Sequence, residues 1–195
     1  MLALTITAGA ISRLAEETAS PLDIMPGPLV TKLAADMQRS VHRNFRDGGR
    51  PLPWPPSRRA METGKKTLID QGLLLDSVHR QGKGYQAVVF TRDKRAFIHE
   101  YGGTIVPRNA KALTIPIAAE ARGRRARSFA DTFLLTRDGK APLIMQTQSD
   151  GSVKPLYVLL KSVTLPARPF IKPPESDINT VMVPRIRRWM DTGQV

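Results

Sequence analysis

The chain has 195 residues, 41% of them hydrophobic, which supports one folded domain and argues against a wholly disordered chain. Its 30 Lys and Arg residues against 17 Asp and Glu give a net charge of +13, so we expect attraction to nucleic acid, an acidic protein face or an anionic membrane. Cysteine, a signal-peptide pattern and an apolar run of about 18 residues are all missing, which excludes disulfides and predicts a soluble intracellular protein.

The N-terminal part of the chain predicts one long helix. Residues 2–6 alternate like a short strand, and residues 11–18 have helical spacing before a proline-rich turn. Apolar residues from Leu29 to Phe45 form one stripe at helical spacing, and Asp47-Gly48-Gly49 ends this helix. The following segment, RPLPWPPSRR, is too rich in proline for a helix or a central strand, so we expect a stiff, extended surface segment anchored by Trp54.

The middle of the chain predicts short elements and then strands. A short helix is expected over residues 58–68 and a turn over residues 73–78, and HEYGGT, from His99, is typical of a second turn. Pro116 places its strand at a sheet edge. The predicted strands are residues 86–91, 112–117, 133–135, 143–146 and 156–165.

The C-terminal part predicts a second proline-rich connector, PARPFIKPP, and then an amphipathic helix. Ser176 is the expected N-cap of that helix and Pro184 its expected kink. The fold class is therefore α+β, with a mostly antiparallel central sheet flanked by N-terminal and C-terminal helices. We expect a single domain over residues 1–195, with a long basic β-hairpin-like excursion over residues 103–156.

The sequence contains no motif that predicts catalysis or a metal site. The three histidines are dispersed, and the sequence TGKKT lacks the first glycine and the final Ser or Thr of a phosphate-binding loop. There is no cysteine and no G-x-S-x-G motif for a nucleophile. We therefore predict no catalytic residue, no metal ligand and no cofactor, and we do not expect an enzyme.

The segment RGRRAR is the densest basic cluster in the chain and is expected to be a loop. Its guanidinium groups could hold phosphates or carboxylates, but it lacks the neighbouring aromatic residues on which nucleic-acid bases stack. A solvated loop and an electrostatic contact, to a DNA backbone or to an acidic protein, both remain open. The cluster consists of Arg122, Arg124, Arg125 and Arg127.

Two large rings, those of Trp54 and Phe170, stand in proline-stiffened peptides. Packing within the chain is the default for both, but stiff segments lose little entropy on binding and also make good subunit contacts. The candidate subunit-interface residues are Trp54, Tyr101, Arg168 and Phe170.

Four segments in a fixed order are similar to a known phage family. They are NFRDGGRPLPW, GKKTLIDQGLLLDSV, FIHEYGGTI and LPARPFI, the last preceding a terminal helix. This order, over roughly residues 29–190, resembles the virion morphogenesis or tail-completion family of Mu-like phages. The chain departs from the family pattern at Phe97-Ile98, where Tyr-Ala is common, and at Gln71, where Thr is common; a packing motif tolerates both changes. Residues 117–156 match nothing diagnostic, so the role of RGRRAR is not implied by the resemblance.

The resemblance implies a structural virion protein that forms a ring, with six as the expected number of subunits, at the head–tail junction. It would act as a tail terminator, tail-completion protein or neck (head–tail connector) subunit. The implied partners are further copies of the chain, the tail tube protein and head-completion or connector proteins, with DNA in the lumen as a further candidate and no membrane partner. RGRRAR is expected to face that lumen.

Two other hypotheses remain open. A basic DNA-binding protein without catalysis shares the charge, but the helix at residues 29–45 is not preceded by the short helix and turn of a helix-turn-helix unit. A nuclease would need carboxylates clustered around a divalent metal. Salt-dependent binding to short DNA duplexes would favour the first, and a structure would reveal the second.

Overall fold

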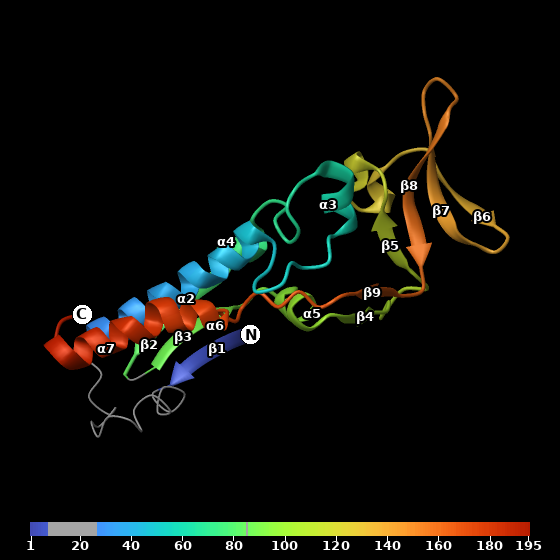
Figure 1. Cartoon of the computed structure of the whole chain (residues 1–195). Coiled ribbons are helices and arrows are strands. Elements are labelled where there is room, and N and C mark those ends of the chain that lie inside the picture. The colour runs from blue at the N-terminus through green and yellow to red at the C-terminus, as the bar shows by residue number, and fades with distance from the viewer. Residues whose placement is uncertain (8–26, 85) are drawn as a thin grey trace. The chain divides into compact units, whose positions relative to one another are not determined.

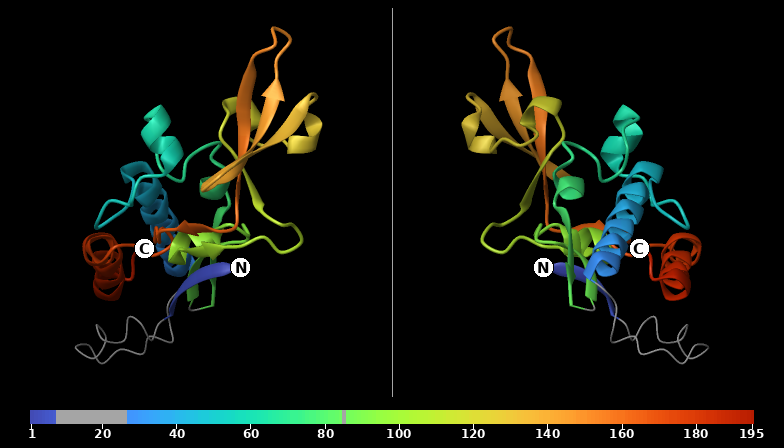
Figure 2. Two further views of the ribbon diagram at one scale, coloured as in Figure 1. Left: turned by 90° about the vertical axis from the view of Figure 1, so that its right-hand side faces the viewer. Right: turned by 90° about the vertical axis from the view of Figure 1, so that its left-hand side faces the viewer.

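The structure is a computed structural model that describes residues 1–7, 27–84 and 86–195. The chain divides into two compact units, which Figures 1 and 2 show as ribbons. Unit 1 comprises Met1–Gly102 and Pro166–Val195, and unit 2 comprises Gly103–Leu165. The predicted helix at residues 11–18 lies outside the described residues. The predicted α+β class, with helices and antiparallel sheets, is confirmed.

Unit 1 contains a three-stranded antiparallel sheet in the order β1-β3-β2, with helix α2 packed against it. Its central strand alternates, so that Ala87, Val89 and Thr91 are buried. The elements are β1 (Leu2–Thr7), α2 (Gly27–Asp47), α3 (Arg58–Thr63), α4 (Leu73–Asp76), β2 (Val78–Lys83), β3 (Gln86–Thr91), α5 (Ala96–Tyr101), α6 (Glu175–Asp177), the π-helical turn η4 (Ile178–Met182) and α7 (Val183–Thr192).

Helix α2 contributes more buried apolar residues to the core of unit 1 than any other described element, as its apolar stripe predicts. The buried apolar side chains are Leu29, Val30, Leu33, Ala34, Met37, Val41 and Phe45. Fully burying a Val, Leu, Met or Phe side chain contributes roughly 1.5–3 kcal/mol to folding, so this stripe is a major source of the stability of unit 1. Gly82 of β2 allows close packing, because a Cβ atom there would lie 3.1 Å from the backbone of Thr31.

Several predicted boundaries in unit 1 were wrong. The turn expected over residues 73–78 is helix α4 followed by the start of strand β2. Strand β2 was not predicted, because its sequence VHRQGK buries one residue and has no apolar alternation. The HEYGGT segment is not a simple turn: its first three residues end helix α5, Gly102 is the C-cap, and Gly103 begins the next strand. Helix α3 stops at Thr63, since Gly64 adopts a left-handed conformation with φ of 67° and its N–H bonds to the carbonyl of Ala60.

The C-terminal helix also begins differently from the prediction. Helix α6 starts at Glu175 after Pro174, so Ser176 lies within the first turn and is not the N-cap. A kink was expected at Pro184; the irregular part of the helical run is the π-helical turn η4, which ends at Met182, directly before α7. Pro184 is the second residue of α7 and follows η4 directly, so it cannot donate a backbone N–H to the helical turn before it.

Unit 2 is an antiparallel β structure with a small core. One ladder consists of strands β4 (Gly103–Ile105) and β9 (Val163–Leu165). A separate four-stranded sheet contains, in spatial order, β5 (Leu113–Pro116), β8 (Val153–Leu160), β7 (Lys140–Thr147) and β6 (Thr132–Arg137). The predicted edge position of Pro116 is confirmed, because β5 ends the sheet. The expected strand over residues 156–165 is divided between β8 and β9. Ala121, Leu156 and Tyr157 form the buried cluster, against which Phe129 and Ile144 pack.

A polar network joins α2 to the C-terminal helices of unit 1. The guanidinium of Arg50 donates to both carboxylate oxygens of Asp177, at 3.1 and 2.8 Å, and to the carbonyl of Ser40 at 2.9 Å. Burial disfavours the charged form of Asp177, but the hydrogen bonds from Arg50 and Ser40 and the charges of Arg50 and Arg43 outweigh it and lower its pKa. The side chains of Arg50 and Asp177 are only 16% and 10% exposed, so this ion pair is well shielded from solvent.

We predict that Asp177→Asn lowers the free energy of unfolding by about 2 kcal/mol, because it leaves the Arg50 guanidinium shielded from water with only the more distant carboxylate of Asp47, at 3.6 Å, as a counter-charge. Chemical denaturation with urea measures the change. Since the pKa of Asp177 lies below its ordinary value when folded, its stabilising contribution is present at neutral pH and is lost as the pH falls through that lowered pKa.

The control is Arg58→Ala, which breaks an ion pair with Glu62 whose side chains are 70% and 43% exposed. An exposed pair of this kind is expected to contribute less than about 0.5 kcal/mol. Equal losses for the two variants would contradict the importance given to the Arg50–Asp177 pair.

Candidate functional site

The two proline-rich segments, residues 50–56 and 166–174, pack against each other within unit 1. Trp54 donates from its indole Nε1 to the carbonyl of Pro169 at 3.0 Å, and Arg168 donates from Nε to the carbonyl of Pro55 at 2.8 Å. Proline has a carbonyl acceptor but no N–H donor, so these segments cannot pair as strands do and side chains satisfy their carbonyls instead. We call them the paired proline segments.

Three aromatic rings fill the space beneath the paired proline segments. The ring of Phe45, at the end of α2, lies 5.7 Å from that of Trp54 and 5.1 Å from that of Phe170, in tilted or edge-on geometry. Gly49 makes the turn into the first segment: its φ is +114°, and a Cβ atom there would lie 2.7 Å from the backbone of Trp54. No other residue could take this place without moving the segment.

Helix α5 holds the second proline segment through its carboxylate. Glu100 accepts hydrogen bonds from the backbone N–H groups of Phe170 at 2.7 Å and Ile171 at 3.1 Å. The carbonyl of the preceding residue, His99, accepts a hydrogen bond from the backbone N–H of Arg168 at 2.7 Å. Burial raises the pKa of Glu100 above its ordinary value, and the two N–H groups offset only part of that effect. The sequence predicted only a turn for HEYGGT, so this role of Glu100 was missed.

We predict that Glu100→Gln is at least as stable as the original chain at pH 7, because the amide oxygen still accepts from the two N–H groups without a buried charge. Glu100→Ala should lose about 2 kcal/mol, because both N–H groups then lack a buried acceptor. Thermal unfolding at several pH values measures both effects.

The pH dependence gives a second test of the same group. A raised pKa in the folded state means that the charged carboxylate costs stability at neutral pH, and this cost disappears as the pH falls through the raised pKa. We therefore expect the carboxyl group of Glu100 to stabilise the original chain as the pH falls through this raised pKa, and we expect Glu100→Gln to lack that gain in stability. An unchanged pH profile in this variant would contradict the shift.

Three of the four predicted interface side chains are buried within unit 1. Trp54, Arg168 and Phe170 are only 7%, 4% and 0% exposed, and their partners belong to the same unit. The structure therefore gives them packing roles within the chain, the default interpretation, and offers no support for a subunit contact through these side chains. Tyr101 is 60% exposed and lies beside Phe97, which is 64% exposed, with ring centroids 4.9 Å apart.

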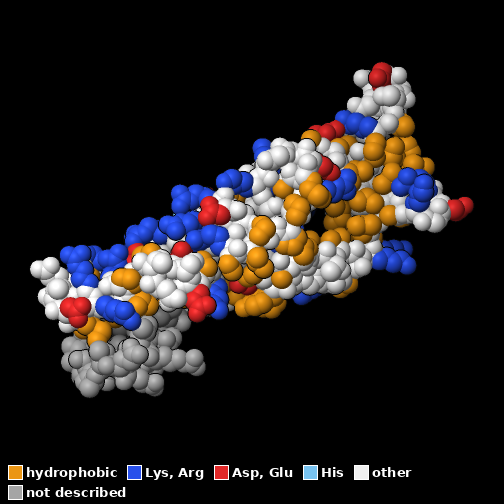
Figure 3. Space-filling view, viewed as in Figure 1, with side chains coloured by type: hydrophobic (Ala, Val, Ile, Leu, Met, Phe, Trp, Pro, Cys, Tyr) orange, Lys and Arg blue, Asp and Glu red, His pale blue; other side chains and the backbone are white. Residues whose placement is uncertain are grey.

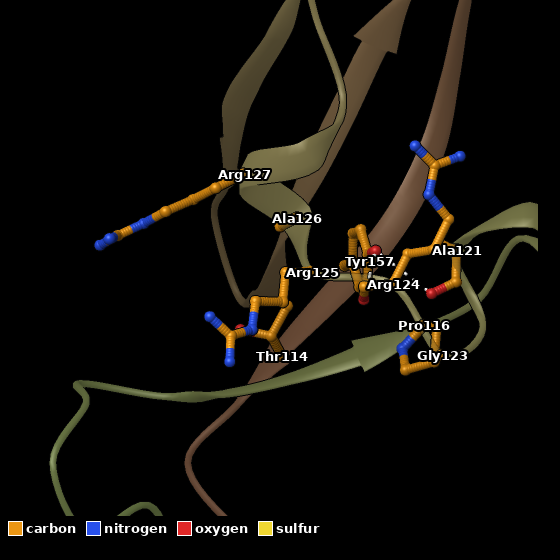
Figure 4. A pocket seen from close by; sticks show the side chains of 9 residues that line it. All are labelled: Thr114, Pro116, Ala121, Gly123, Arg124, Arg125, Ala126, Arg127 and Tyr157. Carbon is orange, nitrogen blue, oxygen red and sulfur yellow. Dashed lines mark hydrogen bonds between the residues drawn. The ribbon is translucent and has the colours of Figure 1, made fainter.

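The predicted arginine cluster lies in unit 2. Arg122, Arg124 and Arg125 lie between two short 3-10 turns, η2 (Ala119–Ala121) and η3 (Ala126–Ser128), and Arg127 lies within η3. Tyr157 fixes this loop from beneath by donating its hydroxyl to the carbonyls of Ala121 at 3.2 Å and Arg124 at 3.0 Å. The loop lines an open pocket of about 480 Å³ together with Thr114 and Pro116 (Figure 4).

The arginines of the cluster differ in what they can bind. The guanidinium carbon of Arg124 lies 4.0 Å from the ring centroid of Phe129, an aromatic contact that sequence reasoning did not anticipate. Arg125 and Arg127 belong to the same loop, and in Figure 4 their side chains point away from that of Arg124. Since the three guanidinium groups diverge, they suit an extended anionic surface better than one small anion. Arg122 is exposed and also belongs to this loop.

A second basic surface lies on α2 in unit 1. Lys32, Arg39, Arg43 and Arg46 follow one another at helical spacing on its exposed side (Figure 3). The buried carboxylate of Asp36 lies in this row and is bonded by Arg39 and, from α7, by Arg185 at 2.7 Å. The crowding of cations in the last turns of α2 was visible in the sequence. The ion pair between Arg185 of α7 and the carboxylate of Asp36 was not.

The described residues form neither a cluster of metal ligands nor a membrane-spanning helix. Across residues 1–7, 27–84 and 86–195, no three His, Asp or Glu side chains are grouped so as to hold a metal ion. None of the helices described in this structure has the length and apolar character needed to cross a membrane.

Comparison with known proteins relates the chain to a phage protein. No family model matches it, and no solved structure matches it. The chain is similar to Mu-like prophage FluMu G protein 2 of Haemophilus influenzae, with 33% identity over 94 residues. The match covers 48% of this chain and 62% of that protein, less than two thirds of the relative's length. The similarity supports a phage protein, related to a Mu-like prophage protein.

Proposed function

We propose that the chain is a structural virion protein of a tailed phage or prophage that forms a ring at the head–tail junction, as a tail terminator, tail-completion protein or head–tail connector. The observation that carries this proposal is the 33% identity to the Mu-like prophage protein. The finer assignment rests on the ordered motifs from NFRDGGRPLPW to LPARPFI, which resemble the tail-completion family of Mu-like phages.

The surface of the chain suits a role in binding macromolecules. Exposed cations form a row on α2 and a diverging cluster in the loop at residues 122–127, and each arrangement fits an extended anionic partner. The proposed partners are further copies of the chain, the tail tube protein and head-completion proteins, with DNA in the lumen as the partner of the arginine cluster. In this proposal the chain binds and positions its partners and has no catalytic role.

The oligomeric state of the purified protein tests the proposed ring. We expect rings in negatively stained electron micrographs at high protein concentration, and a matching mass by sedimentation. Tyr101→Asp should weaken assembly at least tenfold without changing the melting temperature, since it places a charge on an exposed ring that is a candidate contact.

Met61→Asp is the matched control, because Met61 is 66% exposed and is not a candidate contact. Assembly lost equally in both variants would exclude Tyr101 as a specific contact. A protein that remains monomeric at every concentration, and forms no ring when its phage partners are added, would contradict the proposal.

The alternative function is a basic DNA-binding protein without catalysis, and the exposure of Arg125 and Arg127 is the observation that favours it. Each phosphate contact contributes about 0.9 to the slope of log affinity against log salt concentration. For short DNA duplexes we expect the double variant Arg125→Ala/Arg127→Ala to reduce that slope by about 2, because it removes two phosphate contacts.

The matched control is Arg108→Ala/Lys111→Ala, which removes the same charge from exposed residues elsewhere in unit 2. An equal effect in the control would show that net charge alone attracts DNA and would contradict a specific role for the cluster. Tight sequence-specific binding by the isolated chain would favour the DNA-binding alternative over a lumen contact.

A further inference from the structure

Strand β6 is an unprotected edge of the sheet in unit 2. It pairs with β7 on one side only, and all six of its residues are exposed (Figure 1). Three consecutive large apolar residues occupy its centre: Phe133, Leu134 and Leu135 are 41%, 58% and 36% exposed. An edge strand of this kind offers unpaired N–H and C=O groups to any other strand that reaches it.

The other edge of the same sheet is protected, which makes β6 distinctive. Strand β5 carries Pro116, which cannot donate to a further strand. The central residues of β6 include no proline and no charge, the usual means by which proteins block an edge. The β6–β7 register shifts between Leu135 and Arg137, so the regular part of the ladder, Thr132 to Leu135, includes all three apolar residues.

The sequence around β6 is complementary to itself in the antiparallel direction. Residues 131–137 read DTFLLTR, and antiparallel pairing centred on Leu134 places Leu134 opposite its own copy and Phe133 opposite Leu135. The next pair is Thr132 with Thr136. The flanking residues then bring Asp131 of each copy to Arg137 of the other. Apolar, Thr–Thr and opposite-charge pairs are the combinations that stabilise adjacent strands.

The pairing would also continue an apolar surface that already exists. Directly opposite residues of paired strands point to the same face, and within the sheet Leu135 lies opposite Leu143 and Phe133 opposite Met145. The Phe133–Leu135 pairs of two copies would therefore extend this row across the new junction. Leu134 would be covered on the other face by its counterpart.

We propose that the free chain self-associates through β6, which pairs edge to edge with β6 of a second copy in antiparallel register centred on Leu134. The contact joins two four-stranded sheets into one of eight strands. It is twofold symmetric and therefore differs from the head-to-tail contact that closes a ring. The proposal stands independently of the ring, and each can fail without the other.

Cysteine cross-linking tests this register directly, because the chain contains no cysteine of its own. Opposite residues of antiparallel strands have Cα atoms about 4.5–5.5 Å apart, within the range of a disulfide. Under mild oxidation, Leu134→Cys should form a covalent dimer at least tenfold faster than Leu52→Cys, the control at a leucine that is 76% exposed in unit 1. Non-reducing gel electrophoresis measures the rates.

Mixing experiments distinguish this register from a loose contact. Phe133→Cys and Leu135→Cys should each cross-link slowly alone and at least tenfold faster when mixed, because these positions face each other across the twofold axis. A Leu134→Cys rate no higher than that of Leu52→Cys would overturn the proposal. Rapid self-cross-linking of Phe133→Cys would overturn the register. Rings without a Leu134→Cys cross-link would leave the proposed function standing and this contact rejected.

Charge exchange provides a second measurement that needs no oxidation. Arg137→Asp should raise the dissociation constant of the dimer at least tenfold in sedimentation at low salt, because it places a second carboxylate opposite Asp131. Adding Asp131→Lys should restore most of the affinity. Asp131 has a positive φ of 53°, but any strain from lysine there is present in both the monomer and the dimer and does not affect their equilibrium. No recovery in the double variant would contradict the pairing.

Discussion

The hydrogen bonds between the paired proline segments are the constraint on which unit 1 depends. The chain leaves this unit at Gly102 and returns at Pro166, so in the sequence all of unit 2 separates the strands of unit 1 from its C-terminal helices. Helices α6 and α7 can pack against α2 only if the returning segment is fixed in place. Trp54, Arg168 and Glu100 fix it, and the Arg50–Asp177 pair then joins the helices to α2.

The composition of these segments explains how they are held. Extended proline-rich chain offers carbonyl acceptors with few N–H donors, so its partners must be side chains that donate. The indole of Trp54 and the guanidinium of Arg168 do this, and the amide of Asn44 donates to the carbonyls of Phe170 and Lys172. The stiffness that suggested a subunit contact thus serves the interior of the unit.

The parts of the fold that follow from local periodicity could be predicted from the sequence. The α2 stripe from Leu29 to Phe45, the edge position of Pro116 and the α+β class all depend on spacing along the chain. Strand β2 was missed because its exposed residues carry no apolar pattern. The start of helix α6 was misplaced because Pro174, not Ser176, is its N-cap.

The contacts that form the sites could not be predicted from local periodicity, because they join residues far apart in the sequence. The Arg50–Asp177 contact joins residues 127 apart, and the role of Glu100 depends on backbone N–H groups 70 and 71 residues away, so no local motif announces either. The basic loop was visible as RGRRAR, but the stacking of Arg124 on Phe129 required the fold. Exposure of Trp54 and Phe170 could not be inferred from their proline neighbours, since such segments also occur in interiors.

The two units offer surfaces of different chemistry. Unit 2 presents diverging arginines, which suit an extended polyanion, and an apolar edge strand, which suits another strand. The row of cations on α2 adds a second basic surface, in unit 1. A protein that holds DNA, neighbouring subunits and other virion proteins together would use both kinds of surface, and this combination underlies the assembly role proposed for the chain.

A cryo-electron microscopy map of the phage particle, with this chain placed in it, tests the central claim most directly. Our account predicts a closed ring of copies at the junction of head and tail, with the loop at residues 122–127 lining the lumen. Intact, infectious particles that contain no copy of the chain at that junction would contradict it.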